Sequence, residues 1–308
     1  MAESEVIKVR YSKKNGCFLL LVVLLTAICN AEIFGSETAI WEADSSVVEY
    51  FQVNGGTRPS NISTLSLWYD FPATKSGSTH PWMEYGLPIG NGQIGAVLLG
   101  GVLQDEIVLN EKTLYNGSPT DYGDHGTYAC LGRILVDDLS GMASVNDGSR
   151  PVNNYTRFLD IEEGVAGVDF GTAEGIHHSR RYLVSAPHRV MAAHYQTDGN
   201  GTLHLCFRYI PDGSIGASEV TYRDATATFG GKLRIVSYST EMRVMAVGGT
   251  VTTTTRGIEV EGATEVTLFM TAATNFDDRT PAFVSGTQSD VEVRNRQLLD
   301  IACRDGWD

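Results

Sequence analysis

The chain has 308 residues, of which 42% are hydrophobic and 19% are charged, so it can bury the core of one large domain or of two ordinary ones. Its formal net charge of −14 argues against a nucleic-acid partner, because binding to a phosphate backbone relies on clustered lysine and arginine side chains that release counterions. A neutral or polar ligand fits this charge better.

The N-terminal segment predicts export. Basic residues up to Lys14 precede an uncharged apolar run from Cys17 to Cys29, which is shorter than the roughly 20 residues of a membrane span. We expect a signal peptide over residues 1–31, cleaved after Ala31, and a secreted or extracellular protein; an uncleaved signal anchor at a membrane is the alternative. Residues 32–64 are polar and lack periodicity, which predicts a disordered or linker segment.

Two further features concern the exported state. An odd number of cysteines remains after cleavage, so no disulfide framework is implied. Tripeptides of the N-x-S/T type predict glycosylation on surface loops. The cysteines are Cys130, Cys206 and Cys303, and the acceptor asparagines are Asn61, Asn154 and Asn200.

A glycine-rich stretch organises the first part of the folded chain. Gly90 to Gly95 (GNGQIG) match the dinucleotide-binding pattern, and Glu111 follows at the spacing of a ribose-binding acid. That pattern needs a strand before it and a helix after it. Pro88 lies where a central strand would donate hydrogen bonds, and the apolar residues after Gly95 predict a strand. The stretch is therefore interpreted as a site loop or a structural bend, and an NAD-dependent enzyme stays the third hypothesis.

The next segment predicts a hairpin. Residues 106–109 are apolar enough to pair with residues 96–99 through the intervening turn. Antiparallel pairing would place Asn91 and Glu111 on one rim. Together with Trp82 and Asn110, these residues are of types that stack on sugars or hydrogen-bond to them, so we take the four as substrate-rim candidates.

The remainder of the chain is rich in valine, threonine, isoleucine and tyrosine, separated by glycine or aspartate turns. The predicted strands span residues 165–170, 177–185, 190–196, 202–209, 233–239, 242–247, 251–255, 258–260 and 266–271. A spacing of roughly ten residues leaves no room for crossover helices, so the predicted fold is an all-β antiparallel sandwich. A short C-terminal helix is predicted over residues 289–303 from the spacing of its apolar positions.

Several polar groups invite a catalytic interpretation. His177 to Arg181 could bind a metal or an anion, but strand alternation separates the side chains and favours an exposed polar strand. Ser185 and His188 lack a nucleophile elbow and predict a turn. The acidic pairs 162–163 and 277–278 are adjacent in sequence and rarely span a sugar, so we interpret them as solvated charge. No metal and no cofactor are predicted.

Several motifs in fixed order carry a family resemblance. They are Trp68 to Ala73 (WYDFPA), Trp82, Leu87 to Ala96 (LPIGNGQIGA), Leu109 to Tyr115 (LNEKTLY), Tyr128 with Leu131 and Gly132, Asn154 to Asp160, Arg180 to Pro187, and the segment from Gly262 to Phe276. Over residues 65 to 280 the chain resembles the N-terminal region of glycoside hydrolase family 95, the α-L-fucosidases. The interval between Tyr115 and Tyr128 is shorter than in family members, which places the rim near Asn116 outside the pattern.

The resemblance implies an antiparallel β super-sandwich over residues 65–285 and the start of a helical linker over 286–308. In the family, that linker leads to an (α/α)6 barrel that holds the catalytic residues for inverting hydrolysis of terminal α-L-fucosyl linkages. No catalytic residue can be assigned to this chain, which we expect to be a truncated fragment, inactive alone. The implied partners are a fucosylated oligosaccharide or glycan, through the full-length enzyme, and the barrel itself. A free-standing carbohydrate-binding or interaction module without catalysis is the second hypothesis.

Overall fold

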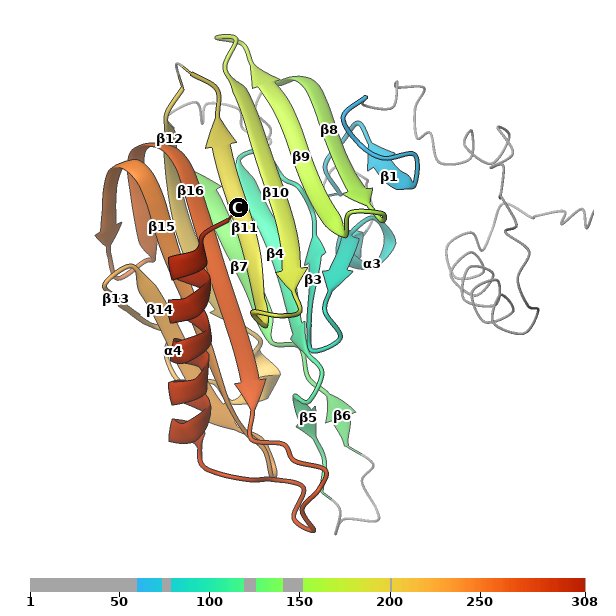
Figure 1. The fold of residues 1–308 in the computed structure, drawn as a ribbon, viewed down its shortest axis with the longest axis vertical. Coiled ribbons are helices and arrows are strands. Elements are labelled where there is room, and N and C mark those ends of the chain that lie inside the picture. The colour runs from blue at the N-terminus through green and yellow to red at the C-terminus, as the bar shows by residue number, and fades with distance from the viewer. Residues whose placement is uncertain (1–59, 74–78, 119–125, 141–151, 200, 308) are drawn as a thin grey trace, which may run out of the picture. The chain divides into compact units, whose positions relative to one another are not determined.

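The computed structural model describes residues 60–73, 79–118, 126–140, 152–199 and 201–307. The predicted signal peptide, most of the predicted linker and Asn200 lie outside these residues. The described chain is antiparallel β-structure with one long helix at its C-terminal end (Figure 1), which confirms the predicted all-β fold class.

The elements follow in chain order. The strands are β1 (Ser66–Tyr69), β2 (Leu87–Gly90), β3 (Ile94–Leu98), β4 (Gln104–Glu111), β5 (Tyr115–Asn116), β6 (Thr127–Tyr128), β7 (Gly132–Asp138), β8 (Val152–Asp160), β9 (Val165–Thr172), β10 (His177–Ser185), β11 (Val190–Thr197), β12 (Leu203–Pro211), β13 (Thr221–Arg223), β14 (Thr226–Lys232), β15 (Ser237–Thr253) and β16 (Ile258–Thr274). The helices are α3 (Pro81–Glu84), the 3-10 helix η2 (Gly213–Ile215) and α4 (Gln288–Asp305).

One continuous sheet folds over into two facing layers. Layer A contains β1, β8, β9, β10 and β11, and layer B contains β2, β3, β4, β7 and β12, with β16 between β11 and β12. Strands β2 and β3 contact β8 to β11 across the interior, so the inner faces of the layers form one core. In Figure 1 the two layers overlap, and α4 lies against β15 and β16.

The long strands β15 and β16 belong to both layers. The second part of β16, Glu265 to Met270, pairs with β11, whereas its first part, Ile258 to Ala263, pairs with β12. The β15–β16 ladder shifts register between Val247 and Gly248. A bulge of this kind bends a strand and increases its twist, which lets the pair pass from one layer to the other.

The break predicted in each of these strands is wrong. Residues 242–247 and 251–255 form parts of one strand of 17 residues, and so do residues 258–260 and 266–271. Gly248, Gly249 and Gly262 have φ values of 73°, 65° and 77°. These glycines form a bulge within a paired ladder instead of a turn, because only glycine takes a positive φ without steric cost.

The prediction that no strand precedes the glycine-rich stretch is also wrong. Strand β2 precedes it and includes Pro88, which pairs with Val97 of β3. β2 is the last strand on its side of the sheet, an edge position where the missing N–H of proline is tolerated. The element that follows is β3 and not a helix, so the context for a dinucleotide site is incomplete.

Helix α4 packs mainly on β15 and β16, next to β11, and confirms the predicted C-terminal helix. Leu299 and Ala302 bury against Val190, Ala192 and Phe269. A capping box of Thr287 and Asp290 begins the helix, because each side chain accepts a hydrogen bond from the backbone of the other. No helix among the described residues is long and apolar enough to span a membrane.

Candidate functional site

The turn between β2 and β3 is fixed by the side chain of Asn91. Its Oδ1 accepts hydrogen bonds from the backbone N–H groups of Gln93 (2.9 Å) and Ile94 (2.8 Å). Its Nδ2 donates to the carbonyl of Ser185 at the end of β10, at 2.9 Å. One asparagine therefore closes the turn in layer B and fastens it to layer A.

Glu111 lies beside this turn, at the end of β4, where it pairs with Ile94. Its side chain is only 1% exposed, and its carboxylate accepts from the backbone N–H and the hydroxyl of Thr113, each at 2.8 Å. The Thr113 hydroxyl also lies 2.6 Å from the hydroxyl of Thr274 in β16. Burial raises the pKa of Glu111, although the hydrogen bonds from Thr113 oppose that effect.

The structure brings three of the four rim candidates together. Asn110 pairs with Gly95 and is exposed, and its Oδ1 accepts from the backbone N–H of Glu111 at 3.0 Å. We call the group of Asn91, Asn110, Glu111 and Thr113 the hairpin end. Trp82 is 46% exposed but lies in α3, before β2, and therefore at the opposite end of that strand.

Aromatic side chains near the hairpin end did not enter the sequence prediction. The rings of Tyr115 and Tyr128 meet edge to face with centroids 5.1 Å apart, and Tyr128 is 72% exposed. The rings of Phe276 and Phe283 lie 6.4 Å apart, both partly exposed. The Phe276 N–H donates to the hydroxyl of Thr274, which connects this pair to the hairpin end. Aromatic faces and a few polar groups are typical of a small-molecule site.

A buried polar cluster lies at the other end of the β3–β4 hairpin. Asp105 is fully buried, and its Oδ2 accepts from the hydroxyls of Tyr182 and Tyr195. Arg180 donates to the carbonyls of Gly101 (2.6 Å) and Val102 (2.9 Å) and lies 3.9 Å from Asp105 Oδ2. Burial raises the pKa of both tyrosines well above the ordinary value. The cluster connects β10 and β11 of layer A to the turn of layer B.

The prediction of an exposed polar strand at residues 177–181 is therefore wrong in part. The alternation is as expected, but it turns His178 and Arg180 inward, where they are 7% and 4% exposed. His178 stacks on Phe170, and Arg181 on the other face pairs with Asp169. The sequence contained a signal in Tyr182, which lies two positions after Arg180 and therefore on the same face of β10.

Ser185 and His188 form a turn, as predicted. Ser185 Oγ accepts from the His188 backbone N–H at 3.3 Å and lies 3.1 Å from its Nδ1. His188 Nε2 lies 3.0 Å from the carboxylate of Asp305. The hydrogen bonds to His188 lower the pKa of Asp305. The three side chains fasten the β10–β11 turn to the last residue of α4.

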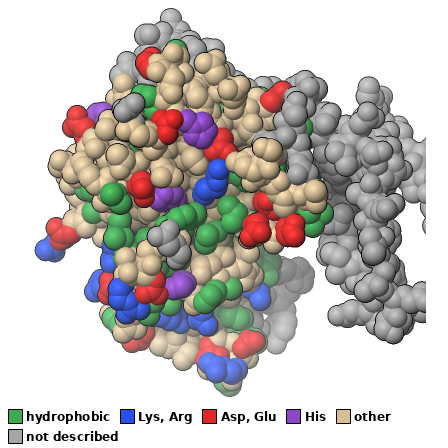
Figure 2. Space-filling model, turned by 45° about the horizontal axis from the view of Figure 1, so that its top comes forward, with side chains coloured by type: hydrophobic (Ala, Val, Ile, Leu, Met, Phe, Trp, Pro, Cys, Tyr) green, Lys and Arg blue, Asp and Glu red, His purple; other side chains and the backbone are tan. Residues whose placement is uncertain are grey.

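Other predicted groups are separated from the hairpin end. Asn61 and Asn154 are exposed, which an acceptor for glycosylation requires, and Cys130, Cys206 and Cys303 are free thiols. No cluster of three or more potential metal ligands occurs within the described ranges. On the face shown in Figure 2, acidic, basic and histidine side chains are interspersed with apolar ones.

Comparison with known proteins gives one family and a few relatives. The model of the glycosyl hydrolase family 65 N-terminal domain matches residues 67–134 and 120–279. An alpha-L-fucosidase 2 from Arabidopsis thaliana is 29% identical over an alignment of 158 residues, which covers 42% of this chain and 18% of that protein. A methyl-coenzyme M reductase I subunit beta from Methanocaldococcus jannaschii is 34% identical over an alignment of 95 residues, which covers 28% of this chain and 21% of that protein.

One solved structure is also similar. A chain assigned as a kojibiose phosphorylase from the human microbiome superposes with a TM-score of 0.44 at 11% identity, over 79% of this chain and 36% of that one. The chain thus spans about a fifth of the length of the curated relatives that it matches.

Proposed function

Because this chain belongs to the family of glycosyl hydrolase family 65 N-terminal domains, we propose that it is the N-terminal β-sandwich of a secreted α-L-fucosidase-like enzyme. Membership confirms the predicted N-terminal glycoside hydrolase domain. The family match over residues 67–279 carries the proposal, and the alignment with the Arabidopsis fucosidase supports an α-L-fucosyl glycan as the substrate class. Catalysis, by the inverting route, belongs to a barrel outside this domain.

Within that enzyme, the domain supplies a braced rim. Asn91 uses its amide to hold the turn and the Ser185 carbonyl, and Glu111 is buried beneath Thr113. These two residues therefore position the hairpin end, and contact with sugar falls to exposed groups beside them. Asn110 and Tyr128 are the exposed groups of suitable type, one for hydrogen bonding and one for stacking.

A domain exchange tests this proposal. Residues 65–285 of this chain replace the aligned N-terminal region of the Arabidopsis fucosidase, and release of nitrophenol from p-nitrophenyl α-L-fucoside is measured. We expect the chimera to hydrolyse the substrate, with kcat/KM reduced roughly tenfold by Asn110→Ala, the loss of about one good hydrogen bond in the transition state. The isolated chain should release none. Turnover by the isolated chain would contradict the placement of catalysis elsewhere.

A stand-alone carbohydrate-binding module is the second candidate. The observation that favours it is the aromatic pair of Tyr115 and Tyr128, whose exposed ring needs no second domain to meet a sugar. Titration of the isolated chain with 2′-fucosyllactose separates the two candidates. Saturable binding that Tyr128→Ala abolishes, together with an inactive chimera, would favour the module.

A further inference from the structure

The outer face of layer B carries a hollow with a volume of about 440 Å³. It is lined by Asp137, Leu139, Cys206, Arg208 and Arg256, from β7, β12 and the β15–β16 turn, together with the residue just after β7. Its size falls within the range of small-molecule sites. Leu205 and Phe207, the neighbours of Cys206 in β12, belong to the core, so Cys206 and the hollow face away from it.

The register of the sheet determines which side chains lie in the middle of the hollow. Cys206 in β12 pairs with Asp137 of β7 on one side and with Glu259 of β16 on the other. Burial raises the pKa of the Cys206 thiol, and the two neighbouring carboxylates add to that effect. Near neutral pH the thiol is therefore an uncharged, weakly polar surface between two acids, and Leu139 extends the apolar part.

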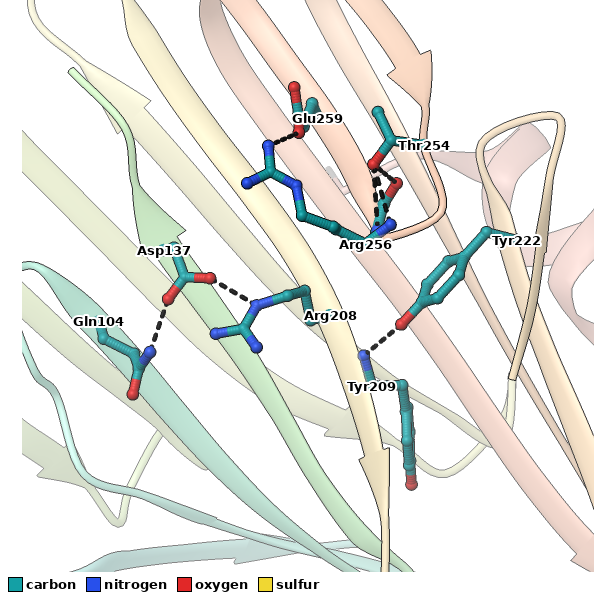
Figure 3. Close-up of polar contacts among 9 residues, drawn as sticks. Gln104, Asp137, Arg208, Tyr209, Tyr222, Thr254, Arg256 and Glu259 are labelled. Carbon is teal, nitrogen blue, oxygen red and sulfur yellow. Dashed lines mark hydrogen bonds and ion pairs between the residues drawn. The ribbon is translucent and has the colours of Figure 1, made fainter. Parts of the chain in front are cut away.

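Two ion pairs border this apolar floor. Arg208 donates through Nε to Asp137 at 2.6 Å, and Arg256 donates through Nη2 to Glu259 at 3.1 Å. Gln104 donates to the other oxygen of Asp137 at 2.6 Å. Figure 3 shows both guanidinium groups on the same side of the sheet. Among the described residues, neither Nη1 nor Nη2 of Arg208 forms a hydrogen bond, and Nη1 of Arg256 forms none.

Hydroxyl groups also hold the backbone at or beside each arginine. The turn that carries Arg256 is closed by Thr254, whose hydroxyl accepts from the backbone N–H groups of Arg256 (3.2 Å) and Gly257 (3.3 Å). Beside Arg208, the hydroxyl of Tyr222 accepts from the Tyr209 backbone N–H at 3.0 Å. The guanidinium groups themselves are oriented by their ion pairs with Asp137 and Glu259, and donors fixed in this way lose less conformational entropy when a ligand arrives.

We propose that this hollow binds an uncharged sugar unit. Free guanidinium N–H groups would donate to ring hydroxyls, and the remaining lone pairs of Asp137 and Glu259 would accept from them. Leu139 and Cys206 would meet the apolar C–H face of the ring. Two positive and two negative groups lie along the border, so the site has no surplus charge to attract an anion. The inference does not depend on the proposed function of the hairpin end.

Saturation-transfer difference NMR on the full chain tests the inference. The probes are the methyl glycosides of L-fucose, D-galactose, D-xylose and D-glucose, with methyl glucuronide and inorganic sulfate as anionic comparators. We expect saturable transfer to at least one neutral glycoside. Arg208→Gln and Arg256→Gln should each weaken its binding by roughly tenfold, because each removes charge-assisted hydrogen bonds.

The matched control is Arg223→Gln, which removes an arginine that is 84% exposed and, among the residues that the structure describes, pairs only with Asp224 in the neighbouring turn. It should leave the affinity unchanged. Arg256 is itself 77% exposed, so its variant keeps the fold even where Arg208→Gln does not. Three results would overturn the inference: no neutral glycoside binds, the anions bind in preference, or binding persists in both arginine variants. Binding lost instead on Asn110→Ala would place it at the hairpin end.

Discussion

Glu111 ends β4 with its carboxyl turned into the space between the two layers. A carboxylate in that position loses most of its hydration, and the hydrogen bonds from Thr113 replace only part of it. Its pKa is therefore raised above the ordinary value. Glu111 consequently acts on the fold through Thr113, which contacts Thr274 of the other layer.

This position predicts a pH-dependent effect of Glu111→Gln. A carboxyl whose folded pKa is raised contributes stability that is present below its unfolded pKa and lost as pH rises through the folded pKa. Glutamine does not titrate and still offers one acceptor to Thr113. The stability of the wild-type chain relative to the variant should therefore fall as pH rises above about 4, the ordinary pKa of a glutamate side chain. Urea denaturation at several pH values measures this difference.

Glu106→Gln is the control for that experiment. Glu106 lies on the same strand but faces outward, where it pairs with the half-exposed Arg133 at 3.0 Å. Its variant leaves Glu111 unchanged, so the stability of that variant should vary with pH as the stability of the wild type does. A stability difference between Glu111→Gln and wild type that is constant across the pH range would contradict the role assigned to burial.

At the scale of elements, the β3–β4 hairpin shows what the sequence could predict. The pairing of β3 with β4 follows from two apolar runs flanking a glycine turn, and it places Asn91 near Glu111 as expected. The inward turn of Arg180 could not be predicted in the same way. A charged residue is assigned to solvent unless its partners are known, and here the partners are carbonyls of a turn that lies far away in sequence.

The long strands β15 and β16 are a second feature that the sequence alone could not predict. Glycines at positions 248, 249 and 262 suggest turns, because a single sequence does not show whether a positive φ ends a strand or bends it. The difference is made by partners on both edges: β16 pairs with β15 along its length and with β12 and then β11 on the other side. Tertiary pairing thus overrides the local turn signal.

Asn91→Ala should destabilise the hairpin and its link to β10. The substitution removes three hydrogen bonds and leaves the Ser185 carbonyl without this donor. We expect a loss of about 1–3 kcal/mol in the free energy of unfolding. Asn91→Asp keeps the acceptor for the turn but not the donor to Ser185, so its free energy of unfolding should lie between those of the wild type and Asn91→Ala. Chemical denaturation gives both values.

The comparison for Asn91 is Asn110→Ala in the facing strand. The Asn110 side chain is exposed and, within the described part of the chain, hydrogen-bonds only to the backbone of its neighbour Glu111, so its loss should cost less than about 0.5 kcal/mol. Equal effects of the two alanine variants would show that Asn91 does not connect the layers.

For the molecule as a whole, polar contacts join the two layers at both ends of the β3–β4 hairpin. Asn91 and Thr113 contact layer A at the hairpin end. Arg180 contacts layer B at the other end, through the carbonyls of Gly101 and Val102. Between these ends the layers meet through apolar side chains. Apolar packing favours closure of the sandwich without fixing its register, and the polar contacts add that geometric specificity.

Arg180→Met tests this account at the level of the whole domain. Methionine keeps the apolar stem but leaves the carbonyls of Gly101 and Val102 without their donor and Asp105 without its nearest cation. Removing one partner of a buried charged group costs about 3–5 kcal/mol, a large share of the stability of a typical domain.

Tyr195→Phe is a milder variant that can be measured if Arg180→Met does not fold. It removes one of the hydroxyl donors to Asp105 and should cost about 1–3 kcal/mol. Arg223→Met, at an exposed pair, should cost under about 1 kcal/mol. If Arg180→Met unfolds at the same urea concentration as Arg223→Met, the buried cluster does not hold the layers together, and the apolar core alone accounts for the fold.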